Sequence, residues 1–318
     1  GGAGYIGSHT CVELLEAGHD VIVLDNLSNS SEESLKRVQE LTGKTLKFIQ
    51  GDIRNQSDLD QAFSSNRIDA VIHFAGLKAV GESQQIPLTY FDHNISGSIQ
   101  LVQAMERAHV FNLVFSSSAT VYGEENSPPY QENMVLGMPN NNYGYTKLIV
   151  EQLLEKLSKA NDEWSIALLR YFNPVGAHKS AQIGEDPQGI PNNLMPYLTQ
   201  VAVGCREKLS IFGQDYPTDD GTCERDFIHV VDLAKAHVLA VENRLKHKGC
   251  RAWNIGTGIP ISVLKIKETF EKVNGVIVNS EFVERRAGDL ACFYADASRA
   301  NRELNWTPEL TLEDMLAD

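Results

Sequence analysis

Tyr143 and Lys147 are the residues of this chain whose types and spacing most directly suggest chemistry. They stand four positions apart in a stretch with helical periodicity, so their side chains are expected to share one helix face. A free tyrosine has a pKa of about 10 and is a poor base at neutral pH. A nearby cation lowers the pKa of a phenol by roughly 1–3 units. The pair therefore predicts a tyrosine that works as a proton-transfer base.

A third side chain strengthens this interpretation, which is weak on spacing alone because Tyr and Lys pairs occur by chance on many helices. Ser118 follows the apolar run 113–115, where a buried strand is expected to end. A hydroxyl at that position is suited to hydrogen-bond a reacting hydroxyl of a substrate. We take Tyr143, Lys147 and Ser118 as the candidate catalytic residues.

The elements that must position these residues alternate along the first half of the chain. Short apolar runs predict buried strands, and the stretches between them predict helices. Continuous apolar strands that alternate with helices indicate a Rossmann-type, doubly wound α/β fold with a parallel sheet covered on both faces. Ligands of such sheets bind beyond the carboxyl ends of the strands. The predicted strands are 21–24, 46–49, 70–74, 113–115 and 165–170, and the predicted helices are 8–17, 97–108 and 143–159.

The first seven residues form a glycine-rich loop that satisfies both G-x-G-x-x-G and G-x-x-G-x-x-G. Glycines at Gly1, Gly4 and Gly7 allow backbone N–H groups to approach a pyrophosphate, and the next helix directs its N-terminus at that charge. A simple turn is the alternative, but two acids at strand ends favour a dinucleotide. Asp25 is placed to bind the adenosine ribose and to repel a 2′-phosphate, which favours NAD over NADP. Asp52 is placed to reach the adenine.

The two halves of the chain differ in the length and regularity of their predicted elements. After about Gly176 the predicted strands become shorter (209–212, 252–255 and 276–278), and Gly, Pro and Asn become frequent through 184–196. We predict an NAD-binding domain over residues 1–176. Residues 177–318 are expected to form mainly a smaller α/β lobe that binds the substrate, with some strands returning to the first domain.

Composition excludes several classes of function. The formal net charge of −14 disfavours binding to nucleic acid. No apolar run reaches the length of about 18 residues that a membrane span needs. The five cysteines are scattered and suit a reducing, cytoplasmic setting, and no cluster has the spacing of metal ligands. Because the chain opens on the glycine loop without Met, we expect a short upstream strand and a C-terminal tail to be missing.

Seven stretches together resemble the extended short-chain dehydrogenase/reductase family, over nearly the whole chain: 1–7, 74–83, 116–123, 143–147, 170–178, 184–196 and 225–230. The resemblance is to members that invert C4 of nucleotide sugars. It implies a reversible interconversion of UDP-galactose and UDP-glucose through a transient 4-keto sugar, with tightly bound NAD, in galactose metabolism. It also suggests a homodimer formed through the helices around 97–108 and 143–159.

The resemblance also implies roles for individual residues. Tyr143 would take the proton of the sugar 4-hydroxyl, Lys147 would hold the nicotinamide ribose, and Ser118 would steady the hydroxyl. The cofactor would be bound by these three and by Gly1, Gly4, Tyr5, Ile6, Gly7, Asp25, Asn26, Asn29, Ser30, Asp52, Ile53, Phe74, Ala75, Gly76, Leu77, Lys78, Asn94 and Phe172. The substrate would be bound by Ser118, Tyr143, Asn173, Asn193, Leu194, Arg225, Arg286, Asp289 and Phe293.

Two positions depart from the pattern of the family. His93 precedes Asn94 where a small polar pair is expected. Phe293 lies where the family places a residue beside the sugar, and we hypothesise that its ring excludes a 2-acetamido group.

Two rival functions make different demands on the sequence. A 4,6-dehydratase of the same fold carries an Asp-Glu pair directly after the residue equivalent to Ser118, whereas Ala119 and Thr120 stand here and neither can protonate a leaving group. A nonenzymatic NAD sensor would keep the glycine loop but would not need Tyr143, Lys147 and Ser118 together.

Overall fold

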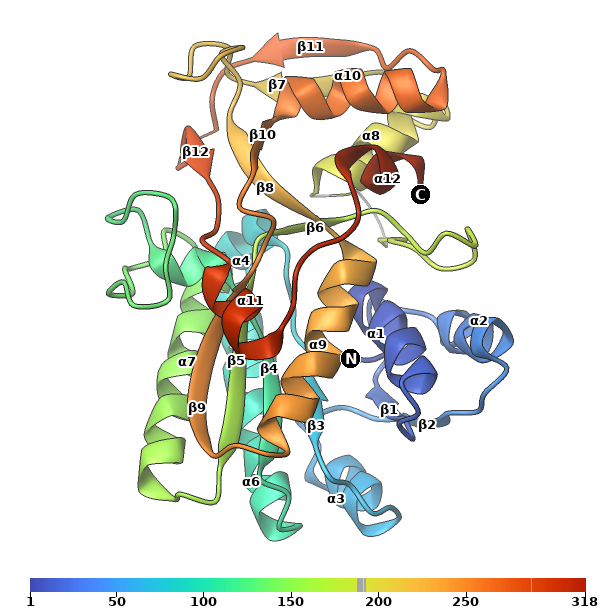
Figure 1. Cartoon of the computed structure of the whole chain (residues 1–318), viewed down its shortest axis with the longest axis vertical. Coiled ribbons are helices and arrows are strands. Elements are labelled where there is room, and N and C mark those ends of the chain that lie inside the picture. The colour runs from blue at the N-terminus through green and yellow to red at the C-terminus, as the bar shows by residue number, and fades with distance from the viewer. Residues whose placement is uncertain (188–190, 192, 287) are drawn as a thin grey trace.

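Parallel strands carry the first part of the chain in the computed structural model, which describes residues 1–187, 191, 193–286 and 288–318 (Figure 1). One sheet pairs β1 (Ile22–Asp25) with β2 (Lys47–Gln50). A second sheet has the order β3-β4-β5-β9, and each neighbouring pair is parallel. Its strands are β3 (Val71–His73), β4 (Asn112–Ser118), β5 (Ser165–Tyr171) and β9 (Gly249–Ile255).

Helices cover both faces of the second sheet, which confirms the predicted doubly wound α/β fold. Side chains alternate between the faces along a strand. On β4 and β5, Val114, Ala167 and Leu169 pack toward α9 (Val230–Arg244). Their neighbours pack on the other face against α6 (Gly97–Arg107) and α7 (Asn142–Ala160): Leu113, Phe115, Ile166 and Leu168. Figure 1 shows α9 beside α1 (Tyr5–Glu16), with α7 on the opposite side of the sheet from α9.

Local capping fixes where several of these helices begin. The side chain of Ser31 accepts a hydrogen bond at the start of α2 (Glu32–Thr42), and that of Asn55 does so for α3 (Gln56–Ser64). Asn141 accepts from Gly144 N at 2.8 Å and starts α7 just ahead of Tyr143. The connection between β3 and α6 contains α4 (Val80–Gln85), α5 (Pro87–Tyr90) and a π-helical segment (Phe91–Ser96). In the described part of the chain, no helix has both the length and the apolarity that crossing a membrane requires.

A smaller α/β lobe lies at one end of the molecule, at the top of Figure 1. In it β7 (Leu209–Phe212) pairs in parallel with β11 (Ser280–Val283). The strand β8 (Glu224–His229) pairs with three others, β6 (Asn173–Val175), β10 (Pro260–Ser262) and β12 (Cys292–Phe293). The helices of this lobe are α8 (Leu194–Ala202), α10 (Val263–Asn274) and α12 (Leu312–Ala317), while α11 (Ser298–Leu304) packs on β9.

The strand predicted at 276–278 is wrong. The backbone N–H groups of Val276 and Val278 donate to Glu271, at the end of α10, to its carbonyl and its side chain. These donors are therefore used to finish the helix rather than to pair in a sheet. The strand begins two residues later, where Ser280 pairs with Leu209.

Three buried histidines predict a loss of stability in acid. Burial lowers the pKa of His73 to about 3 and that of His9 and His237 to about 4, whereas histidine in an unfolded chain titrates near 6.5. Between these values the unfolded state binds more protons, so the free energy of unfolding falls as the pH falls from about 6.5 to about 4. We expect the urea midpoint to decrease across this window, and His73→Asn to weaken that dependence.

The exposed His109 provides the control, since His109→Asn removes a histidine that the fold does not bury. It should leave the pH dependence of the urea midpoint as in the unmodified protein. Equal slopes for the His73 and His109 variants would contradict the assignment to buried histidine.

Candidate active site

The glycine loop packs tightly against the end of β3 and leads directly into α1. A Cβ at Gly1 would lie 2.4 Å from Ala75 N, and one at Gly7 would lie 2.5 Å from Gly1 O. Only glycine permits both approaches. No side chain caps the first turn of α1, whose N-cap is Gly4, so its free N–H groups can bind an anion. The loop therefore fits the pyrophosphate of a dinucleotide.

Asp25 and Asp52, the two acids predicted at strand ends, contact other residues that were predicted to bind the adenosine part of the cofactor. The carboxylate of Asp25 accepts from Ser30 Oγ at 2.9 Å and from Ala3 N at 3.0 Å. Asp52 accepts from Asn26 Nδ2 at 3.0 Å and pairs with Arg54 at 2.8 Å. The structure thus brings Asp25, Asn26, Ser30 and Asp52 together at the ends of β1 and β2, while Asn29 is exposed.

The connection after β3 holds further predicted cofactor residues. Asn94 is buried, and its side-chain amide is fully hydrogen-bonded. Its Oδ1 accepts from Leu77 N at 2.8 Å, and its Nδ2 donates to Leu77 O at 3.0 Å and to Thr146 Oγ1 at 2.9 Å. It therefore fixes the backbone of residue 77 against α7. Lys78 Nζ pairs with Glu185 at 2.7 Å, and Asn193 donates to the same carboxylate at 3.1 Å. Of the predicted stretch 184–196, residues 188–190 and 192 lie outside the described residues.

Tyr143, Lys147 and Ser118 come together at the carboxyl end of β4. Lys147 is only 6% exposed, and its Nζ donates to Ser116 O at 2.7 Å. The same Nζ lies 5.9 Å from the centroid of the Tyr143 ring. Ser118 is the last residue of β4, and its side chain is close enough to the Tyr143 phenol to influence the phenol pKa.

A second group of predicted residues forms in the smaller lobe. Asp289 lies between two guanidinium groups, 3.3 Å from Arg225 Nη2 and 2.9 Å from Arg286 Nε. The Arg286 guanidinium also lies 4.7 Å from the centroid of Phe212, at the end of β7. Two arginines around one carboxylate leave a net positive charge, which suits a diphosphate. Asn173 lies at the start of β6, paired in register with Phe227.

Comparison with known proteins agrees with this geometry. The model of the NAD dependent epimerase/dehydratase family matches residues 1–256. The chain belongs to this family. It is 58% identical over 318 residues to the UDP-glucose 4-epimerase of Bacillus subtilis, covering 100% of this chain and 94% of that protein. It is 55% identical, with the same coverage, to the UDP-glucose 4-epimerase of Pasteurella multocida.

Solved structures of the NAD dependent epimerase/dehydratase family superpose closely on this chain. The UDP-glucose 4-epimerase of Bifidobacterium longum in complex with NAD⁺ and UDP has a TM-score of 0.96 and 48% identity, over 99% of this chain and 94% of that one. The enzyme of Stenotrophomonas maltophila with bound NAD and formylated UDP-arabinopyranose has a TM-score of 0.97 and 52% identity, over 100% and 94%.

The pKa of Tyr143 differs from the value expected for a catalytic base. Burial raises the pKa of Tyr143, and the nearby Ser118 side chain opposes this only in part. Burial also lowers the pKa of Lys147 to about 8, against the attraction of Glu151. In the chain without its cofactor the phenol is therefore a weaker acid than a free tyrosine, and the lowering of the Tyr143 pKa by Lys147 together with an oxidised nicotinamide stays a prediction.

A buried ion pair behind Lys147 was not predicted from the sequence. Glu151 lies one helical turn after Lys147 and pairs with Arg170 of β5 at 2.7 Å, with side chains 0% and 3% exposed. Ser117 donates to the same carboxylate. The pair therefore holds α7 against the ends of β4 and β5, where Lys147 and Ser118 lie. Sequence patterns predict a strand and a helix separately, but they do not indicate which polar side chains of the two will form an ion pair.

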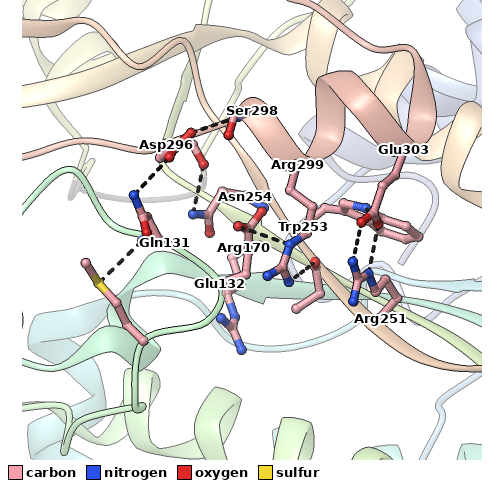
Figure 2. A network of polar contacts seen from close by, with 12 residues as sticks. Gln131, Glu132, Arg170, Arg251, Trp253, Asn254, Asp296, Ser298, Arg299 and Glu303 are labelled. Carbon is pink, nitrogen blue, oxygen red and sulfur yellow. Dashed lines mark hydrogen bonds and ion pairs between the residues drawn. The ribbon is translucent and has the colours of Figure 1, made fainter.

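The wall near Phe293 is aromatic and is held by a polar network. The Phe293 ring lies 4.5 Å from that of Tyr130 and 5.4 Å from that of Phe172, centroid to centroid. Figure 2 shows Asn254 of β9 between the segment that contains Gln131 and the segment that contains Asp296. Its amide donates to Tyr130 O at 2.7 Å and to Asp296 O at 3.3 Å. Both segments are thus anchored to the central sheet.

Proposed function

We propose that this protein is an epimerase that uses tightly bound NAD to interconvert UDP-galactose and UDP-glucose. The observation that carries the proposal is the meeting of Tyr143, Lys147 and Ser118 at the carboxyl end of β4. The similarity to enzymes named UDP-glucose 4-epimerase, at 52–58% identity over the whole chain, supports the same reaction. Ala119 and Thr120 offer no acid–base pair for a dehydratase.

Tyr143 is the proposed base that takes the proton from the sugar 4-hydroxyl and later returns it. NAD, when bound, would supply the hydride acceptor and, in its oxidised form, a positive charge. That charge and the Lys147 ammonium both favour the phenolate, against the burial that disfavours it. Lys147 is held in place by Ser116 O, and Ser118 steadies the reacting oxygen.

Inversion at C4 requires that the hexose present both of its faces. Arg225, Arg286 and Asp289 offer charged groups to the UDP moiety. By contrast Phe293, whose ring packs against that of Phe172, offers the sugar an aromatic surface, which holds it without directional bonds. A firm grip on the nucleotide and a loose grip on the hexose let the 4-keto sugar turn over between the two hydride transfers.

The wider organisation follows from the same proposal. Residues 1–176 would hold NAD, and residues 177–318 would mainly hold the UDP-sugar. A homodimer through α6 and α7 belongs to the same proposal, on the resemblance to the family. The five cysteines are all free, which suits a reducing cytoplasm.

The test of the function uses purified protein and UDP-galactose without added NAD. We expect UDP-glucose to appear, measured by chromatography of the nucleotide sugars, because the cofactor should copurify. A sample stripped of nucleotide should regain the activity with NAD and not with NADP. A 4-keto-6-deoxy product would instead identify a dehydratase, and no conversion with NAD present would refute the proposal.

Widening the aromatic wall should admit a larger sugar. In Phe293→Ser, the space left by the ring should accept a 2-acetamido group, so turnover of UDP-N-acetylglucosamine should rise by about 10–100-fold relative to UDP-glucose. The ratio of kcat/KM for the two sugars is the measurement. Phe282→Ser on β11, where the side chain is 47% exposed, should leave that ratio unchanged. Equal turnover of both sugars by the unmodified enzyme would contradict a barrier at Phe293.

A further inference from the structure

The hydroxyl of Tyr122 is buried between two partners whose chemistry fixes the direction of each hydrogen bond. Tyr122 is 0% exposed and ends the 3-10 turn Ala119–Tyr122, which follows Ser118. Its hydroxyl lies 2.6 Å from Asn254 Oδ1 and 3.1 Å from Arg170 Nη1. A guanidinium only donates and an amide oxygen only accepts. The Tyr122 hydroxyl therefore accepts from Arg170 and donates to Asn254.

The orientation of the Asn254 amide is fixed in the same way. Its Nδ2 lies 2.7 Å from Tyr130 O and 3.3 Å from Asp296 O (Figure 2). Backbone carbonyls only accept, so the nitrogen of the amide must face them and its oxygen must face Tyr122. Asn254 is 0% exposed, so turning its amide over would break all three hydrogen bonds without water to replace them.

The two carbonyls that Asn254 holds belong to segments that also bond each other. Tyr130 N donates to Tyr294 O at 3.0 Å, and Asp296 N donates to Tyr130 O at 2.8 Å. Phe293 directly precedes Tyr294 in the chain. The position of the Phe293 backbone therefore depends on the segment of Tyr130, and that segment is held by the Asn254 amide.

Aromatic rings connect the same residues on their apolar side. The Tyr122 ring lies 5.1 Å from that of Tyr130, which lies 4.5 Å from that of Phe293, centroid to centroid. Tyr130 is 0% exposed, whereas Phe293 is half-buried. Phe293 is thus the exposed end of a row of rings whose buried end is fixed by the Tyr122 hydroxyl.

We propose that Tyr122 is a positioning residue that, through Asn254, fixes the aromatic wall of Tyr130 and Phe293 and thereby narrows the range of sugars that the site accepts. The proposal rests on the proposed function in one respect, that Phe293 lies beside the sugar. Without the Tyr122 hydroxyl, Asn254 Oδ1 would be buried without a donor, which favours any local rearrangement that gives it a new partner. The Tyr130 segment would then loosen, and the Phe293 ring would move aside for a 2-acetamido group.

The test replaces Tyr122 by Phe, which removes one oxygen and keeps the ring. Hydrogen exchange of the NAD-bound protein without substrate, followed by mass spectrometry, reports the order of the backbone on either side of Asn254. We expect peptides that cover 127–134 and 292–298 to exchange about tenfold faster than in the unmodified protein. Peptides that cover α2 and α10, which lie outside this network, should exchange as before.

The kinetic measurement is the ratio of kcat/KM for UDP-N-acetylglucosamine to that for UDP-glucose. In Tyr122→Phe we expect this ratio to rise by about three- to tenfold, less than in Phe293→Ser because the ring is loosened and not removed. A general loss of structure would lower kcat/KM for both sugars alike and leave the ratio unchanged. Asn254→Leu should raise the ratio at least as much, and the double variant should add nothing further, since both changes remove the same hydrogen bond.

Tyr90→Phe is the matched control, because it removes the same atom from another buried tyrosine. Tyr90 is 0% exposed, and its hydroxyl also has two partners, Ala79 O at 2.8 Å and Glu82 Oε2 at 2.7 Å. Neither partner belongs to the aromatic wall. Tyr90→Phe should therefore leave the exchange of both wall peptides and the ratio for the two sugars unchanged.

Unchanged exchange of both wall peptides in Tyr122→Phe, or an unchanged ratio despite faster exchange, would overturn the assignment. Additive effects of the Tyr122 and Asn254 changes would overturn it as well. The exchange measurement needs no substrate, so it separates this inference from the proposed function. If the unmodified protein converts no UDP-galactose while Tyr122→Phe still loosens both peptides, the proposed reaction is wrong and the anchoring of the wall by Tyr122 stands.

Discussion

Replacing Tyr143 by Phe should lower the rate of epimerisation by about 10²–10⁴-fold, the range by which positioned acid–base groups accelerate reactions. The change removes one oxygen and leaves the ring against Lys147 in place. Binding of NAD should survive, because the glycine loop and the acids at the strand ends do not depend on the phenol. The kcat for UDP-galactose and the NAD content of the purified variant are the two measurements.

Tyr145→Phe is the matched control, since it removes the same atom two residues along the same helix. The Tyr145 ring packs against Phe91 at 6.2 Å between centroids, on a different side of α7 from Lys147. We expect its kcat to stay within about twofold of the original, because the half-buried Tyr145 is not among the residues proposed to bind substrate or cofactor. Retention of more than a tenth of the original rate by Tyr143→Phe would exclude Tyr143 as the base.

Replacing Arg170 by Met should destabilise the protein by about 3–5 kcal/mol, because the charge of Glu151 would stay buried without its partner. Glu151 is 0% exposed, and Arg170 bonds both of its carboxylate oxygens. Urea unfolding at neutral pH measures the change. The double variant Arg170→Met/Glu151→Leu should recover most of the loss, since no unpaired charge remains.

The exposed pair of Lys208 and Glu281 provides the comparison, at the same 2.7 Å separation but with side chains 46% and 41% exposed. Lys208→Met should change the free energy of unfolding by less than about 1 kcal/mol. Similar losses for the Arg170 and Lys208 variants would show that burial of the Glu151–Arg170 pair does not set its contribution.

The periodicity of apolar residues was enough to predict the helices and strands that carry the site. It failed where contacts between residues far apart in the sequence determine the structure. The strands of the central sheet and the helix of Tyr143 are strongly patterned, and the structure differs at their ends by a few residues. The apolar run 276–278 has strand composition, but the end of α10 uses its backbone donors. No local pattern showed that Phe212 would lie under Arg286, or that Glu151 would meet Arg170. The pKa of Tyr143 depends on burial, which spacing on a helix does not report.

The position of β9 has a consequence for how the protein is made. This strand pairs along the whole length of β5, Ser165 with Gly249 through Tyr171 with Ile255, although the two are separated by the entire β6–α9 region. A nascent chain leaving the ribosome therefore exposes one edge of β5 until residue 255 has emerged. An open strand edge invites pairing with other chains. Pausing or proteolytic cutting within this interval would leave an aggregation-prone half-sheet, so the central sheet cannot be completed before β9 has been made.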